Sequence, residues 1–490
     1  MARRDAPRRS AVWLATAVAA AAVIGTGFVA AELRLAANKP FWLDEWFAMS
    51  SVIRSQGAVR LVVHGAEGQG SPAPLDFLLV EALDAARSGV RYLGLPPHAY
   101  FRLVGVVATV GAAAYAFLAT LAGAGRSTSP GDPTTRALFA LLASASFLAN
   151  PRVVYYAAEM RPYALWAALS LVSAVSLLRT GRRARLVSVI ALVLLGMTAT
   201  ASIFQIAALA VATIAVGLLR REPLAAVCSD AGARFALPLA VSLFYCLHSQ
   251  RWGYPAEMRA WSSFLPFWAA RAWVPAAAGL ATLLCFRRED TRALAVPSLG
   301  LALVYLMAPG IFWLTRTRGM FFAEKQYIYH AATLPLVFAT AALVLQRAGD
   351  AARRRVRAVV AASAAAALLF GTAYALTGKA GVAMRGWQQL RTGTGIPADR
   401  SGVLAGLLKR ELPRSFCLEG PATSVAEGNV RLVAEWLPVR HPALPAGKRA
   451  VVLEARGDGA EVVSLADSCG SATPVPVGDA GGLEPHAGGT

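Results

Sequence analysis

Charged residues are scarce in this sequence, and most of them are basic. Only 16% of the 490 residues are charged, whereas 56% are hydrophobic; soluble domains are usually about 25% charged. The composition therefore excludes an ordinary soluble domain and favours a chain that lies mostly in a bilayer. The net charge is +20, but the basic residues form short clusters between apolar runs, such as RTGRRAR at 179–185. That pattern is typical of cytoplasmic loops and argues against a nucleic-acid partner.

Cysteine is rare too, and familiar catalytic motifs are missing. The five cysteines form no CxxC pair, which argues against a zinc or iron–sulfur site. Cys417 and Cys469 stand apart in the polar C-terminal part, where they would either pair in an oxidising compartment or remain single. The chain also contains no Walker A loop, GxGxxG turn, HExxH or GxSxG motif.

Long apolar runs dominate the chain. The first run, from Ala11 to about Ala31, suits a membrane anchor better than a signal peptide because it is about 20 residues long. Further runs lie near 101–122, 136–150, 162–178, 186–200, 202–219, 232–247, 269–286, 292–312, 327–346 and 357–376. We therefore expect about eleven transmembrane helices, with an uncertainty of one.

The arginine clusters predict the orientation of these helices. With the N-terminus inside, the dense clusters near 126–136, 179–185, 220–221, 287–288 and 353–357 all fall on the cytoplasmic side, as the positive-inside rule requires. The first loop, 32–100, then lies outside. Its apolar stretch at 74–86 contains Asp76, Glu81 and Asp84, so it predicts a helix on the membrane surface rather than a further span.

The sequence divides into three parts. Residues 1–376 form the predicted transmembrane domain. Residues 377–470 contain strand-like runs, RAVVLEA and EVVSLA, and predict a small α/β domain on the outer side. Residues 471–490 are rich in glycine and proline and are expected to be disordered. The predicted fold class is an α-helical polytopic membrane protein with this small C-terminal domain.

The first candidate site is the stretch FWLDEWF at 41–47. Its rings are expected to anchor at the membrane interface and to hold Asp44 and Glu45 at headgroup level. Desolvation there, together with the neighbouring charge, would raise a carboxylate pKa toward the range of a general base. The alternative is that both carboxylates are ordinary solvated loop charges.

Two further stretches are expected on the same side of the membrane. NPRVVYYAAEMRPY at 150–163 carries Glu159, Arg161 and Tyr163, and an arginine near a helix N-terminus is suited to phosphate. The second stretch carries Arg316, Arg318 and Lys325. The simpler alternatives are an interfacial ion pair between Glu159 and Arg161 and a snorkelling anchor at Lys325.

These stretches together resemble motifs of the GT-C superfamily of membrane glycosyltransferases, which includes the protein O-mannosyltransferases and the lipid A aminoarabinose transferase. FWLDEWFAMS is similar to the family's first-loop Asp-Glu motif, and NPRVVYYAAEMRPYALWAALSL to its Tyr-Tyr-x-x-Glu-x-Arg-Pro-Tyr segment. GSPAPLDFLLV, FRLVGVVATVGAAAYAFLATLAG and KQYIYHAATLPLVFATAAL resemble later family segments. The order and spacing agree over roughly residues 10–345.

The resemblance implies an inverting transfer of a sugar from a polyprenyl-phosphate donor to a lipid, polysaccharide or protein acceptor. It implies Asp44 as the general base with Glu45 in support, and a donor site lined by Glu159, Arg161, Tyr163, Arg316, Arg318 and Lys325. A divalent cation, Mg, Mn or Zn, would be held by Asp44 if one is used. PAPL at 72–75 lacks the family's histidine, so His64 and Glu67 are candidate substitutes on the acceptor or metal side.

Three functional hypotheses follow from these patterns. The first is a glycosyltransferase of the bacterial inner membrane whose active face is periplasmic. The second is a transporter or flippase of lipid-linked sugars, which would show paired repeats and charges near mid-membrane; neither is evident in the sequence. The third is an inactive relative whose outer domain binds a partner.

Overall fold

A computed structural model describes most of the first 347 residues and four strands near the C-terminus. The described residues are 6–39, 41, 45, 48–67, 73–90, 95–123, 133–179, 181–248, 260–286, 289–317, 324–347, 389, 415–419, 450–455, 461–466 and 474–476.

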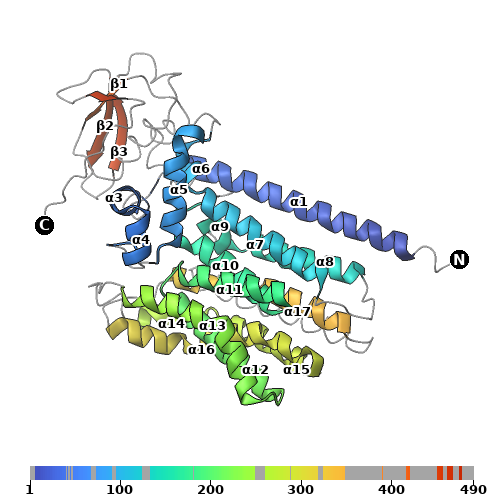
Figure 1. Ribbon diagram of the computed structural model, residues 1–490. Helices are drawn as coiled ribbons and strands as arrows, with labels where there is room; N and C mark the ends of the chain where they lie inside the picture. The colour runs from blue at the N-terminus through green and yellow to red at the C-terminus, as the bar shows by residue number, and fades with distance from the viewer. Residues whose placement is uncertain are drawn as a thin grey trace.

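The long helices lie side by side in one bundle (Figure 1). They are α1 (Ala6–Asn38), α7 (Leu103–Ala122), α8 (Pro133–Leu148), α10 (Pro162–Leu177), α11 (Arg182–Gly196), α12 (Ser202–Leu219), α13 (Leu224–Leu247), α15 (Trp273–Phe286), α16 (Val296–Thr317) and α17 (Thr333–Arg347). Short elements connect them: η1 (Met49–Ile53), α3 (Arg54–Gln56), α4 (Ala58–His64), α5 (Leu75–Val90), α6 (Pro97–Phe101), α9 (Pro151–Ala157), α14 (Trp261–Ala269), η4 (Glu289–Ala295) and η5 (Glu324–Ala332).

Helix α10 is the centre of the bundle. Fourteen of its sixteen residues are buried, and it packs against α7, α11 and η5. By contrast, the candidate spans in α1 and α13 are only 11% and 22% buried, although both are strongly apolar. An apolar surface of that kind is stable in lipid rather than in water, so these two helices lie at the lipid-facing periphery.

The described residues contain six helices long and apolar enough to cross a membrane, or seven if the bent pair α8 and α9 is one span. This indicates a helical membrane protein, but it does not support eleven crossings. The runs predicted near 162–178 and 269–286 form helices of only 16 and 14 residues. Such helices extend about 20–24 Å, less than the roughly 30 Å of a bilayer core. The run at 357–376 lies outside the described residues.

The helices of the predicted first loop cover one end of the bundle (Figure 1). The backbone N–H of Leu75, at the start of α5, donates to the carbonyl oxygen of Met197, just beyond α11, at 2.9 Å. The Tyr245 hydroxyl, near the end of α13, donates to Val62 O of α4 at 2.9 Å. Gly57 and Gly65 bound α4 with φ near +70°, a conformation that favours glycine. We call this the loop end of the bundle.

Helix ends near the loop end follow local sequence signals. The Asn150 side chain accepts from the backbone N–H groups of Arg152 and Val153, and Pro151 follows as the first residue of α9. Pro162 likewise opens α10 directly after Arg161. Proline is favoured at this position because its missing N–H has no partner within the helix. The chain therefore turns sharply between α9 and α10 and presents residues 158–161 at the loop end.

Four short strands form a sheet in the order β3-β2-β1-β4. Their bounds are β1 Ser415–Glu419, β2 Ala450–Ala455, β3 Glu461–Ala466 and β4 Pro474–Pro476. β1 and β2 are parallel, with Cys417 opposite Ala450, and the other pairs are antiparallel. β2 and β3 coincide with the two predicted strand runs. An α/β class for residues 377–470 remains a prediction, and Cys469 lies outside the described residues.

Candidate functional site

A buried ion pair joins the first acidic motif to the start of α7. Arg102 is fully buried between α6 and α7, and its Nε and Nη2 atoms donate to Glu45 Oε1 and Oε2 at 3.0 and 2.6 Å. The Arg102 Nη1 group also donates to the carbonyl oxygens of Ala36 and Lys39. One guanidinium thus fixes both the end of α1 and the position of Glu45, in the two-pronged geometry that makes arginine–carboxylate pairs strong.

Glu45 also connects this motif to the segment before α10. Its Oε1 accepts the backbone N–H of Met160 at 2.5 Å, and its exposed fraction is 0%. Burial opposes ionisation, but the Arg102 guanidinium and the Met160 N–H outweigh it and hold the pKa of Glu45 below its usual range. Glu45 is therefore an ionised structural link between two segments rather than an exposed carboxylate.

A second buried pair lies beside the first. Lys39 Nζ donates to Glu159 Oε1 at 2.8 Å, and both side chains are less than 10% exposed. The ammonium also lies 4.7 Å from the centre of the Tyr155 ring, where the ring's negative face attracts it. The simpler alternative, an ion pair between Glu159 and Arg161, differs from the structure in its partner, because Glu159 pairs with Lys39 at the end of α1.

Arg161 faces a different set of groups. Its guanidinium lies 5.6 Å from the Tyr163 ring, and its Nη2 is 3.5 Å from the Tyr163 hydroxyl. It also lowers the pKa of a nearby carboxylate, Asp76. Arg161 and Tyr163 are thus brought together at the loop end, as the sequence predicts.

Asp76 is a site residue that the sequence analysis treated only as an interruption of an apolar helix. It belongs to the first turn of α5 and is 4% exposed. Burial raises its pKa to about 7, against the opposing effect of Arg161 and with a further contribution from Glu45. A carboxyl group with a pKa near neutrality is suited to proton exchange. The signal in the sequence was an aspartate directly after PAPL, where a helix was expected to start.

The aromatic residue that begins the motif also lies elsewhere than predicted. Phe41 is 1% exposed and packs against Phe101 and the ring of His98, and the Arg102 guanidinium lies 5.0 Å from its ring centre. It belongs to the small core that η1, α4, α5 and α6 share. The prediction that this ring anchors at the membrane interface is therefore wrong, because it fills the core under the loop-end helices.

The other predicted residues are distributed as follows. Asp44 and Arg318 lie outside the described residues. Lys325 belongs to η5, an element that packs against α9 and α10; its side chain lies outside the described part. Arg316 is exposed at the end of α16.

The two residues predicted for an acceptor or metal, His64 and Glu67, lie at and just beyond the end of α4. His64 is exposed at the end of α4, while Glu67 accepts two hydrogen bonds from Arg60 at 3.0 and 2.8 Å. Among the described residues, no group of three or more His, Cys, Asp and Glu side chains could hold a metal ion. A divalent cation at Asp44 remains a prediction.

The site therefore joins three segments far apart in sequence: the end of α1 with the acidic motif, the start of α5, and the turn between α9 and α10. Two buried ion pairs connect the acidic motif and the end of α1 with the start of α7 and the turn before α10, and Arg161 lowers the pKa of Asp76 at the start of α5. Neither a family model, nor a characterised protein, nor a solved structure matches this chain, so the case for any function stands on these residues.

Proposed function

We propose that the protein is an inverting membrane glycosyltransferase. It would transfer a sugar from a polyprenyl-phosphate donor to a lipid, polysaccharide or protein acceptor, with Asp44 as the general base. The proposal includes a location in the bacterial inner membrane, an inner N-terminus and a periplasmic loop end. It also includes the outer C-terminal domain, residues 377–470.

The observation that carries the proposal is the anchoring of Glu45. Asp44 precedes it directly, and consecutive Cα atoms are about 3.8 Å apart. Glu45 is fixed by Arg102 and by the N–H of Met160, which lies next to Arg161 in the chain. The residue that follows the proposed base is therefore bound to the segment expected to bind the donor, which supports the resemblance between the two motifs and the family. A base works only when it is positioned within hydrogen-bond reach of the proton it removes.

The chemistry needs few groups, because the leaving group is already a good one. Asp44 would take the proton of an acceptor hydroxyl while the oxygen of that hydroxyl forms a bond to the anomeric carbon. The bond from that carbon to the phosphate oxygen breaks, and its electron pair stays with the departing polyprenyl phosphate. Arg161 and Lys325, with Arg316 or Arg318, would stabilise this phosphate, since fixed cations act strongly where charge develops. Glu159, paired with Lys39, would shape the donor site rather than contact phosphate.

The decisive test is transfer by purified wild type and Asp44→Asn protein from several polyprenyl-phosphate sugars. A positioned base typically contributes about 10²–10⁴-fold in rate, so we expect a loss of that size. Asp84→Asn is a matched control in the same loop, because its carboxylate pairs with Arg54 and Arg87. Undiminished transfer by Asp44→Asn would reject the base, and vesicle transport of the lipid-linked sugar without transfer would favour a transporter.

A further inference from the structure

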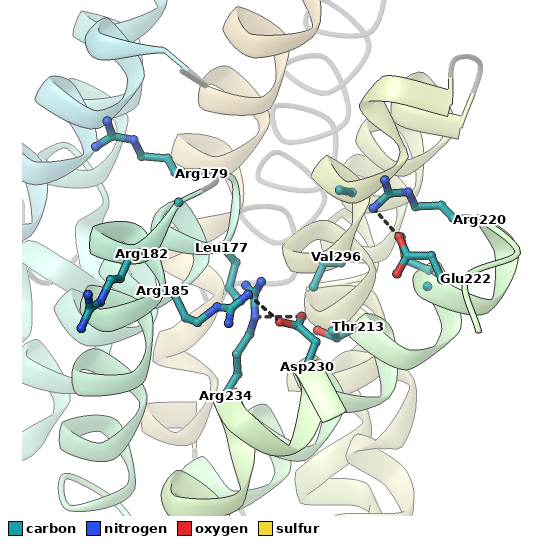
Figure 2. Close-up of a pocket in the computed structure, with 14 residues that line it drawn as sticks. Leu177, Arg179, Arg182, Arg185, Thr213, Arg220, Glu222, Asp230, Arg234 and Val296 are labelled. Carbon is teal, nitrogen blue, oxygen red and sulfur yellow. Dashed lines mark ion pairs between the residues drawn. The ribbon is translucent and has the colours of Figure 1, made fainter. Parts of the chain in front are cut away.

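The strongest feature outside the proposed active site is a cavity of about 480 Å³ at the opposite end of the bundle. It lies where α10 and α12 end and where α11, α13 and α16 begin (Figure 2). Helix α10 runs from Arg161 at the loop end to Leu177 at the cavity. Sixteen residues of helix span about 24 Å, so the two sites are separated by most of a bilayer core.

Positive charge is in excess around this cavity. The described lining residues include five arginines, at 179, 182, 185, 220 and 234, but two carboxylates, Glu222 and Asp230. The lining therefore carries three more positive than negative charges, and one more if only the arginines directed toward the cavity, Arg185, Arg220 and Arg234, are counted. Clustered basic residues at one end of a helical bundle are attracted to the anionic surface of a membrane leaflet.

The ion pairs leave guanidinium donors available. Arg185 of α11 and Arg234 of α13 reach the single carboxylate of Asp230, at 3.1 and 3.0 Å. Figure 2 shows these side chains converging from two helices beside Thr213, while Arg179 and Arg182 are directed away. Across the cavity, Arg220 Nη1 pairs with Glu222 Oε1 at 2.9 Å. Each guanidinium has five N–H donors, and one carboxylate engages only part of two such groups. The Arg185 side chain is also 54% exposed, so its free donors are accessible.

The remaining lining favours a lipid over a nucleotide. Leu177, Val216 and Val296 add apolar surface to the cavity, and none of its described lining residues is aromatic. A nucleotide base would therefore find no ring on which to stack. Outside the cavity, Leu186 and Leu219 are about 60% exposed, an apolar surface that acyl chains would cover.

We propose that this cavity binds the phosphate-bearing headgroup of an anionic membrane lipid. Arg185 and Arg234 donate hydrogen bonds to the phosphate, and Arg220 lies on its other side. The acyl chains lie against the exposed Leu186 and Leu219. Asp230 holds the two arginines in place while the cavity is empty and competes with the phosphate for their donors. Basic pockets between transmembrane helices are a recurring form of lipid recognition.

The test measures lipid binding to the full chain purified in detergent. Short-chain phosphatidylglycerol is titrated and bound lipid is counted by native mass spectrometry. Phosphatidylcholine with the same chains supplies a neutral headgroup, and inorganic phosphate supplies the anion without the lipid. We expect phosphatidylglycerol to bind clearly more tightly than phosphatidylcholine, and equimolar inorganic phosphate not to displace it. Equal binding of the two lipids, or displacement by inorganic phosphate, would overturn the lipid assignment.

Three variants locate the site. Each arginine near a membrane surface adds about five-fold to anionic-lipid affinity, so the double variant Arg185→Gln, Arg234→Gln should bind about 25-fold more weakly. Arg60→Gln is the matched control, since Arg60 is 55% exposed and pairs with one carboxylate at the loop end; it should bind like wild type. Asp230→Asn should bind several-fold more tightly, an effect that misfolding does not imitate. Wild-type affinity in the double variant, or weakened binding in Asp230→Asn, would overturn the proposal.

Discussion

The charged side chains at the two ends of α10 differ in burial and in pairing. At the loop end, Glu45 pairs with Arg102 and Glu159 with Lys39, and all four side chains are less than 10% exposed. At the cavity end, Arg185 and Asp230 are 54% and 35% exposed, and arginines outnumber carboxylates. One end is a set of matched buried pairs, while the other is an open basic surface.

The difference in burial indicates a different property for each end. Burying an ion costs several kcal/mol unless its partner and hydrogen bonds compensate, so the loop end gains positional precision and not stability from its pairs. That precision is what a site with a positioned base requires. At the cavity end, the partly exposed pairs contribute little to stability, and the excess of positive charge stays available to an external anion.

The largest expected effect comes from breaking the buried pair. Arg102→Ala leaves Glu45 ionised, buried and without its main partner, which should lower the unfolding free energy by about 3–5 kcal/mol. Thermal unfolding in detergent measures it. The exposed counterpart at the cavity end is Arg185→Ala, since the Arg185 side chain is 54% exposed; it should cost less than about 1 kcal/mol. Equal losses in the two variants would remove the distinction between the ends.

Asp76 should make the stability of the loop end depend on pH. Its pKa rises from 3.8 to about 7 on folding, so the folded state holds the proton more tightly than the unfolded state. The contribution of Asp76 to the free energy of unfolding is fully present below about pH 4. It is lost as the pH rises to about 7, and the total loss is up to about 4 kcal/mol. Between pH 5 and pH 9 the free energy of unfolding should therefore fall less steeply in Asp76→Asn than in wild type. Parallel pH curves would contradict this role.

A glycine tests how tightly the loop end is packed. A Cβ atom at Gly105 would lie 2.8 Å from the carbonyl oxygen of Ala157 and 3.3 Å from the Ala164 side chain. Because a backbone atom cannot rotate away, Gly105→Ala should cost about 1–3 kcal/mol. Gly111→Ala, in the same helix with nothing within 4 Å, should be neutral or stabilising by up to about 1 kcal/mol. A neutral Gly105→Ala would indicate loose packing between α7 and α9.

The sequence predicted much of the helical pattern because apolar composition extends along each helix. The bounds of α7, α12 and α17 fall close to the predicted runs at 101–122, 202–219 and 327–346. The number of crossings was harder to predict, because α10 and α15 are apolar but contain only 16 and 14 residues. Composition reports that a segment avoids water, but only length decides whether it can span a bilayer.

The site was predicted in part, and the failures have one physical cause. Glu45, Glu159, Arg161 and Tyr163 were expected near one another, and the structure brings them to one end of the bundle. Their partners were not foreseen: Arg102 lies 57 residues from Glu45, and Lys39 lies 120 from Glu159. Pairing across such distances depends on how helices pack, which neither periodicity nor local motifs encode. Asp76 escaped notice for the same reason, since its burial depends on contacts made by distant segments.

The smallest expected effect on stability sharpens the comparison most. Arg185→Gln removes one of the two arginines that pair with the partly exposed Asp230 carboxylate, while Arg234 remains 3.0 Å from it. Surface pairs of this kind contribute about 0–1 kcal/mol, so thermal unfolding in detergent should change by less than about 0.5 kcal/mol.

The same variant should respond differently in an anionic bilayer. A ligand that binds only the folded protein stabilises it more at a given concentration when it binds more tightly. Phosphatidylglycerol should therefore stabilise wild type more than Arg185→Gln, whereas phosphatidylcholine should not separate them. A stability loss above 1 kcal/mol in detergent without lipid would show that the cavity arginines hold the fold together. The two ends of α10 would then serve the same structural purpose, and the contrast between positioning and binding would fail.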